Sequence, residues 1–252
     1  LRQSAKQDEE LTSFSEFQVL EYFLSFIIPR KDTNPIAHAL IEAFGSLYGV
    51  FQATEEELYS INGMTQNAAC FIADFLPISR KIQCSCFASQ KYVSRLSDAV
   101  NVLRPYFYGR NSEFIYCLAL DLNDRLLQIC KISDGEADSV VINNNKILAL
   151  VTRTKAKKII LAHNHPAGNI KPSDSDLQST RMLNVLLAGV NARLSDHIIF
   201  SGDEYFSFYE SDLLACFSDD NSHYANEQRR KKRSEGIYME DEKPSEETLG
   251  EE

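Results

Sequence analysis

The sequence predicts an α/β domain, a mixed β-sheet sandwiched by helices, preceded by a small all-α domain. Three observations support this prediction. Apolar residues recur at helical spacing in the first third of the chain, short Ile-, Leu- and Tyr-rich segments begin near residue 113, and these segments alternate with helical patterns. Strands mixed with helices, some of them joined by tight turns, favour a mixed sheet covered by helices.

The first 82 residues are expected to form the helical domain, with four or five short helices. Proline lacks the backbone N–H and clashes with the preceding turn, so Pro29 ends the first helix, and Gly45 is placed to end the second. Thr54 and Glu57 have the spacing of a capping box. Helices are expected over residues 14–28 and 35–44, from 54 onward, and over 66–76.

Residues 83–110 are expected to be a linker with one helix, and residues 111–218 the α/β domain. Strands are expected where apolar segments lie between turn signals at 123–124, 134–135 and 201–203. The expected strands span residues 113–122, 125–132, 157–162, 197–200 and 205–209, and the expected helices span 92–103, 142–154 and 177–188.

Residues 219–252 are charged and contain few large apolar groups, so they are expected to be a disordered tail. The tail contains a basic run at residues 229–233. Such a run can bind nucleic acid or an acidic partner, or it can be a solvated part of the tail. The acidic residues that follow the run favour the solvated tail.

Removal of the chain beyond about residue 220 is expected to leave the melting temperature nearly unchanged. A segment with few apolar side chains to bury cannot offset the entropy cost of its own ordering. Thermal unfolding of the full and shortened chains, followed by circular dichroism, tests this expectation. A large drop in melting temperature would show that the tail packs on the folded part.

Charge, apolar runs and cysteine placement argue against several classes of protein. The chain carries 26 basic and 36 acidic residues, a net charge of −10, which disfavours a protein that coats nucleic acid through a basic surface. No apolar run approaches the roughly 20 residues of a membrane-spanning helix. Six irregularly spaced cysteines without an export signal indicate reduced, mostly buried thiols, so we expect a cytoplasmic protein with no membrane partner.

The most informative chemical pattern lies between positions 163 and 176. His163 and His165 follow an apolar strand, and both imidazoles can face one ion because residues i and i+2 of an extended segment point to the same side. A proline and a glycine then turn the chain, Ser173 opens a helix, and Asp176 lies in its first turn. Two histidines, one carboxylate and a water molecule make the open tetrahedral site of a catalytic zinc, which lowers the pKa of water to about 7.

Each part of this pattern also has a structural interpretation. Ser173 and Asp176 have the spacing of a helix-capping pattern. An isolated His-x-His is often structural, because histidine is commonly half-buried with a satisfied hydrogen bond. The two motifs together, at the end of a predicted strand and separated by a turn, favour the metal site.

His-x-His, seven residues, Ser, two residues and Asp is the signature of the JAMM or MPN+ metalloproteases, and residues 163–176 resemble the RadC family in particular. The resemblance covers roughly residues 10–215 and implies a JAMM/MPN-type, cytidine-deaminase-like fold for the α/β domain. Further segments that resemble this family are its helix–hairpin–helix region at 43–64, a helix at 180–183, and the closing strands at 196–199 and 206–208.

The resemblance also implies roles for individual side chains. His163, His165 and Asp176 would hold one zinc ion. Glu113, just before the first strand, would be the general base that takes a proton from water and passes it to the leaving group. Ser173 would help to hold the developing oxyanion while it still caps the helix. The alternative for Glu113 is a surface carboxylate at a strand end.

His197, which follows Asp196, has two interpretations. It is either a third histidine ligand or a structural residue in a polar cluster behind the sheet. Asp176 already completes the three protein donors that a catalytic zinc site needs, which favours the structural interpretation.

The resemblance implies a zinc-dependent hydrolase, a metallopeptidase or isopeptidase-like enzyme that acts on a protein or peptide. RadC-like proteins also carry a DNA-repair label, so one alternative is a DNA-associated protein of repair or recombination whose helical domain contacts nucleic acid. Thr65 stands where the usual hairpin has its second glycine, and no lysine follows, which weakens that alternative. Another alternative is a metal-binding scaffold without turnover, and an intact Glu113 and Ser173 argue against it.

Overall fold

The computed structural model of the protein describes residues 8, 11–134 and 142–217. The predictions made for the tail at 219–252, for its basic run and for Gly135 concern residues outside this description.

The chain divides into two compact units, and the boundary follows Ser207. In the second unit, the buried rings of Phe208 and Phe217 have their centroids 6.5 Å apart. The six cysteines all lie in the described ranges as free thiols, but only Cys117 is buried, so the expectation that most of them are buried is wrong. No helix in these ranges combines the length and the apolar character needed to cross a bilayer.

The N-terminal residues of the first unit form helices. Gly45 ends the second of them with a φ of +79°, a left-handed conformation that glycine adopts readily. Thr54 and Glu57 form the predicted capping box. The helices are α2 (Glu16–Ile27), α3 (Asn34–Phe44), α4 (Leu47–Gln52), α5 (Glu55–Tyr59) and α6 (Gln66–Cys86). Their buried side chains form one hydrophobic cluster that includes Leu20, Leu24, Leu40, Leu58, Ala69 and Ile72.

The expected boundaries of two helices are wrong. α6 continues past position 76, through Pro77, to Cys86. Proline removes a single backbone donor, and Pro77 is exposed, so water can bond the carbonyl group that loses its partner. The helix expected over 92–103 is α7 (Leu96–Phe107), because the side chain of Asp98 accepts backbone N–H groups just before the helix, at 3.0 and 3.1 Å, and sets its start.

The α/β domain is built on a five-stranded mixed sheet in the order β2-β1-β3-β4-β5, which confirms the mixed sheet of the predicted α/β class. β3 and β4 are parallel, and the other neighbouring pairs are antiparallel. The strands are β1 (Phe114–Leu120), β2 (Leu126–Asp134), β3 (Lys158–Asn164), β4 (Arg193–Ser201) and β5 (Glu204–Ser207). β4 begins four residues before its expected start at 197, because it pairs with the whole of β3 from Arg193 onward.

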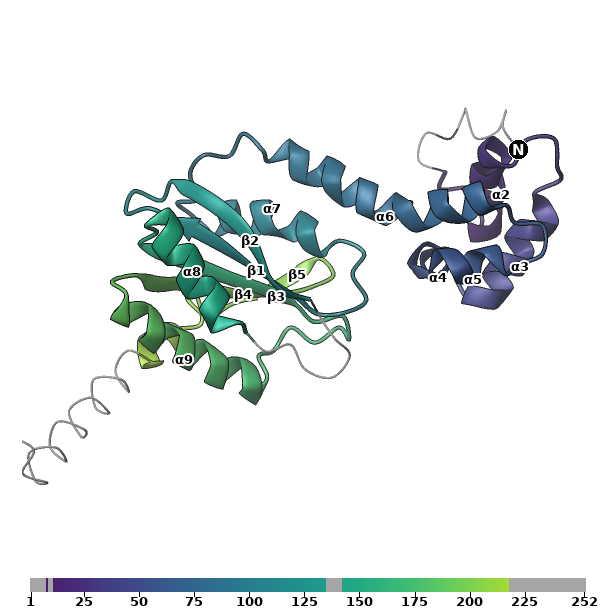
Figure 1. Ribbon diagram of the computed structural model, residues 1–252. Helices are drawn as coiled ribbons and strands as arrows, with labels where there is room; N and C mark the ends of the chain where they lie inside the picture. The colour runs from purple at the N-terminus through teal and green to yellow at the C-terminus, as the bar shows by residue number, and fades with distance from the viewer. Residues whose placement is uncertain (1–7, 9–10, 135–141, 218–252) are drawn as a thin grey trace, which may run out of the picture. The chain divides into compact units, whose positions relative to one another are not determined.

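Helices cover both faces of this sheet (Figure 1). α7 packs on one face, and α8 (Asn144–Thr154) and α9 (Asp174–Gly189) pack on the other. Side chains alternate along β3: Ile160 and Ala162 belong to the hydrophobic cluster beneath α7. His163 therefore faces the layer of α8 and α9, and this layer contains the candidate site.

Candidate metal centre

His163 lies at the end of the central strand of the sheet. β3 is hydrogen-bonded to β1 on one side and to β4 on the other, and all of its residues are buried. His163 itself is only 4% exposed. A strand with two neighbours has little freedom, so the imidazole has a defined position.

His165 lies just after the end of β3, and its backbone is still hydrogen-bonded to β4. Its backbone N–H donates to the carbonyl oxygen of Phe200 at 2.8 Å, and the chain then turns at Gly168, where φ is +90°. The turn brings the carbonyl oxygen of Asn169 to 2.6 Å from Nδ1 of His165. A carbonyl group only accepts, so Nδ1 carries the proton and Nε2 has a free lone pair.

Asp176 is placed by the start of α9. Ser173 is the N-cap residue, and its hydroxyl accepts the N–H of Asp176 at 3.2 Å, while Oδ2 of Asp176 accepts the backbone N–H of Ser173 at 2.7 Å. This capping box was one of the two interpretations of the sequence, and the structure contains it. It also fixes the direction of the carboxylate toward the two histidines.

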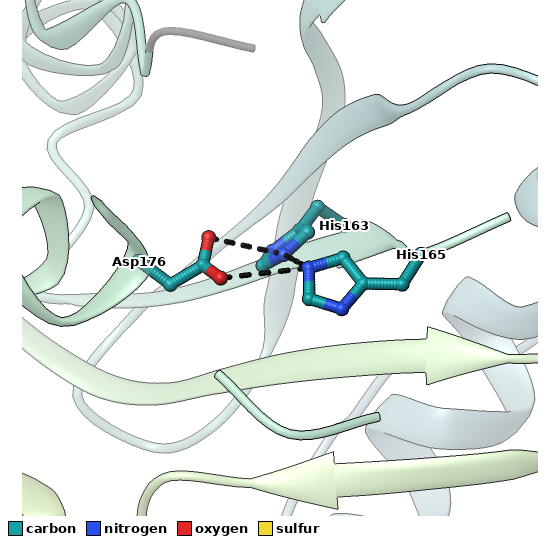
Figure 2. A group of neighbouring side chains, drawn as sticks. All are labelled: His163, His165 and Asp176. Carbon is teal, nitrogen blue, oxygen red and sulfur yellow. Dashed lines mark hydrogen bonds and ion pairs between the residues drawn. The ribbon is translucent and has the colours of Figure 1, made fainter. Parts of the chain in front are cut away.

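The structure brings His163, His165 and Asp176 together, as Figure 2 shows. The two Nε2 atoms are 2.9 Å apart. Oδ1 of Asp176 lies 3.2 Å from Nε2 of His163, and Oδ2 lies 3.4 Å from Nε2 of His165. Three donor atoms, from β3, from the turn that follows it and from α9, therefore face one point.

These spacings fit a metal ion. A tetrahedral zinc with bonds of about 2.0–2.1 Å holds its ligand atoms about 3.3 Å apart, close to the distances found here. Two nitrogen lone pairs that face each other repel unless a proton or a cation lies between them. Three protein donors leave a fourth position open, as in catalytic zinc sites.

The charges of the three groups also suit a cation. Burial lowers the pKa of His163 to about 4, so its imidazole is neutral at pH 7. When the ring of His165 is protonated, its Nε2 can donate to Asp176, and this hydrogen bond raises the pKa of His165 against the effect of burial. Burial acts to raise the pKa of Asp176, but its hydrogen bonds with His165 and Ser173 and its interaction with His163 outweigh burial and hold this pKa well below its usual value. The carboxylate is therefore ionised, and the site is anionic when both imidazoles are neutral.

The metal-free protein is expected to lose stability as the pH falls from 6.5 towards 4, in part through His163. In this window an unfolded histidine with a pKa of 6.5 binds a proton, whereas folded His163, with a pKa of about 4, does not. Proton binding by the unfolded state then lowers the free energy of unfolding, by about 2 kcal/mol at pH 5. Urea unfolding of chelator-treated wild type and His163→Gln at pH 7 and pH 5 measures this effect. The variant should lose less stability than wild type, and equal losses would contradict a neutral, buried His163.

Glu113 lies immediately before β1, at the position that the resemblance requires. Burial raises the pKa of its carboxyl group, nearby His165 lowers it, and the negative charge of Asp176 raises it. These interactions place the carboxyl group in the electrostatic field of two of the candidate ligands, His165 and Asp176. A carboxylate with a raised pKa is a stronger base than an ordinary one.

Asn164 holds the segment that carries Glu113, a role that the sequence analysis missed. Its Oδ1 accepts the N–H of Phe114 at 2.8 Å, and its Nδ2 donates to the carbonyl oxygen of Ser112 at 2.9 Å. The side chain therefore bonds the backbone on both sides of Glu113. The only sequence signal was the position of this amide between the two histidines.

Ser173 lies at the exposed edge of the site. Its hydroxyl donates to Oδ2 of Asp176 at 2.6 Å. The capping role is present in this geometry, whereas the oxyanion role stays a prediction.

We expect Ser173→Ala to cost about 1 kcal/mol of stability through loss of the cap, which urea unfolding of the metal-free protein measures against wild type. An unchanged stability would show that the capping box contributes nothing here.

His197 is not one of the three converging donors. It is buried on β4, and its Nε2 lies 2.8 Å from Nδ1 of His163, on the far side of that ring from the site. The structural interpretation placed it in a polar cluster behind the sheet. The cluster exists, but it lies on the same face of the sheet as His163. Thr180 of α9 belongs to it, with its Oγ1 2.7 Å from Nδ1 of His197.

Proteins from several bacteria are similar to this chain over most of its length. UPF0758 protein FN0909 of Fusobacterium nucleatum is 32% identical over 211 residues, which is 81% of this chain and 91% of the relative. UPF0758 protein COPRO5265_1522 of Coprothermobacter proteolyticus is 29% identical over 73% of this chain and 80% of its own length. UPF0758 protein BTH_I0781 of Burkholderia thailandensis is 26% identical over 79% of this chain and 76% of its own length.

The sequence model of the RadC-like JAB domain family matches residues 93–213, a range that contains the whole candidate centre. Sequence similarity, the mixed sheet and the placement of the histidine pair agree: the chain belongs to the RadC-like JAB domain family.

Proposed function

We propose that the protein is a zinc-dependent hydrolase that cleaves peptide or isopeptide-like amide bonds. One observation supports this most strongly: His163, His165 and Asp176 converge with donor spacings that suit zinc. Two of these residues, His165 and Asp176, also act electrostatically on Glu113. The fold is that of a family that is commonly metal-dependent and broadly hydrolase-like. A zinc ion held by these three residues would supply a Lewis acid and lower the pKa of water to about 7.

The side chains of this protein would then divide the proton transfers between them. The carboxylate of Glu113 takes a proton from the attacking water as the water oxygen adds to the amide carbonyl carbon. Glu113 next delivers that proton to the amide nitrogen, the C–N bond breaks, and the products are a carboxylic acid and an amine. Ser173 lies at the exposed edge, where its hydroxyl can turn its one hydrogen from Oδ2 of Asp176 to the oxyanion. Asn164 keeps the segment of Glu113 in place during both transfers.

Bound metal and hydrolysis of a substrate library test this proposal together. Elemental analysis of the purified protein should find about one zinc per chain. A library of fluorogenic peptides and isopeptide-linked peptides should contain substrates whose cleavage stops with a chelator and returns with added zinc. A protein that binds zinc but cleaves no member of the library would favour the scaffold without turnover.

A nucleic-acid library in the same assay covers the alternative of a DNA-associated protein. Hairpins of this kind bind phosphate through free backbone N–H groups at the start of a helix. At the start of α6 the hydroxyl of Thr65 accepts the N–H of Ala68 at 3.2 Å, so this donor is already used. The preceding α5 begins with three glutamates, which repel phosphate. We therefore propose a protein or peptide substrate rather than a nucleic acid.

A further inference from the structure

A buried chain of hydrogen bonds runs from the backbone of α9 to the far side of His163. Oγ1 of Thr180 lies within hydrogen-bond distance of the carbonyl oxygen of Asp176, and 2.7 Å from Nδ1 of His197. Nε2 of His197 lies 2.8 Å from Nδ1 of His163. Thr180 and His197 are 0% and 1% exposed, so water does not compete for these contacts.

The direction of every bond in this chain is determined by its first member. The carbonyl oxygen of Asp176 can only accept, so the single hydroxyl hydrogen of Thr180 points to it. The oxygen of Thr180 is then the acceptor for His197, whose Nδ1 carries the proton. A fully buried imidazole is neutral, so Nε2 of His197 carries none and accepts from Nδ1 of His163. His163 is left with a free lone pair on Nε2, the atom that faces the candidate centre.

Without this chain, the opposite tautomer of His163 would be favoured. Oδ1 of Asp176 lies 3.2 Å from Nε2 of His163, and a carboxylate attracts a proton to that nitrogen. An imidazole with its proton on Nε2 cannot give that nitrogen to a metal. Two acceptors, the carboxylate of Asp176 and Nε2 of His197, therefore compete for one proton from opposite sides of the ring.

We propose that His197 is a positioning residue that keeps the proton of His163 on Nδ1, so that Nε2 is ready to bind the metal. This inference rests on the proposed metal centre. Thr180 in turn sets the orientation of His197. The helix α9 therefore contributes to the site twice. The carboxylate of Asp176 is a candidate ligand, and the backbone carbonyl group of Asp176, through Thr180 and His197, determines the tautomer of His163. His197 is not itself a ligand, because its Nε2 already accepts the bond from His163.

Three variants test this role. His197→Leu removes the acceptor at similar size. His197→Gln can place an amide oxygen near the position of Nε2 and should rescue the bond. Thr180→Val keeps the shape of the threonine but removes the hydroxyl, so His197 is free to turn its other tautomer toward His163. ¹⁵N chemical shifts of the His163 ring in chelator-treated protein report the tautomer, and competition with a chromogenic chelator reports the affinity for zinc.

In wild type and His197→Gln we expect the proton of His163 on Nδ1. In His197→Leu the proton should move towards Nε2, and the affinity for zinc should fall about 10-fold to 100-fold, the usual effect of losing such a partner. Thr180→Val should change both readouts in the same direction by a smaller factor. A purely structural role would lower the melting temperature and leave the tautomer and the zinc affinity unchanged.

Unchanged tautomer and zinc affinity in His197→Leu would overturn the inference while the metal centre stands. If His197→Leu does not fold, Thr180→Val decides instead: a His163 ring with wild-type shifts and wild-type zinc affinity in that variant would also overturn it. A wild-type protein that binds no zinc would contradict the metal centre itself, and the inference with it. These outcomes separate failure of the positioning role of His197 from failure of the proposed function.

Discussion

The Glu113→Gln variant is expected to lose hydrolytic activity by about 100-fold to 10,000-fold, the usual contribution of general acid–base catalysis. Glutamine keeps the size of the side chain and its ability to form hydrogen bonds, but it cannot accept a proton from water at neutral pH. Because Glu113 is outside the group of three converging donors, the zinc content and the melting temperature should stay close to those of wild type. The measurements are kcat on a peptide found with the library, zinc by elemental analysis, and thermal unfolding.

Glu42→Gln is a matched control for this substitution. Glu42 is an exposed residue of α3, and the same change of charge there should leave hydrolysis at the wild-type rate. Two results would contradict the assignment of Glu113. Loss of zinc in Glu113→Gln would make Glu113 a ligand or a structural support. Full activity with bound zinc would mean that another group is the base.

His165→Ala should remove most of the bound zinc and, with it, all hydrolysis that depends on the metal. His165 contributes one of two nitrogen donors, and the two atoms that remain do not make the three-ligand set of a catalytic zinc site. The fold should survive, because His165 follows β3 at the edge of the domain and its backbone bonds to Phe200 and Ser201 do not involve the ring. Elemental analysis and circular dichroism measure the two parts of this prediction.

His38→Ala provides the comparison. His38 is an exposed histidine of α3 that stacks on Phe17, with ring centroids 4.3 Å apart, and it takes no part in the candidate centre. Its replacement should leave zinc content and hydrolysis unchanged. If His165→Ala retained a full equivalent of zinc, the assignment of the metal centre would be wrong.

Pattern and turn signals predicted most of the α/β domain, but the helix boundaries depended on side chains outside the periodic pattern. The five strands lie within a few residues of their expected ranges, because alternating or continuous apolar segments between turns leave few other solutions. The end of α6 and the start of α7 were misplaced. The exposed Pro77 did not end α6, and a capping contact of Asp98 determined where α7 begins. The spacing of apolar residues encodes neither effect.

The sequence by itself determined the local half of the site. His163 and His165 share one side of an extended segment, and Ser173 and Asp176 share one helical turn, because both relations span only a few residues. Only the tertiary structure decided which residues lie behind these groups. His197 lies on β4, which follows α9 in the chain and pairs in parallel with β3, and this pairing brings it to His163. Asn164 reaches the backbone around Glu113, about fifty positions away. Such contacts depend on the register between distant strands and on the packing of α9, and no short spacing in the chain encodes either one.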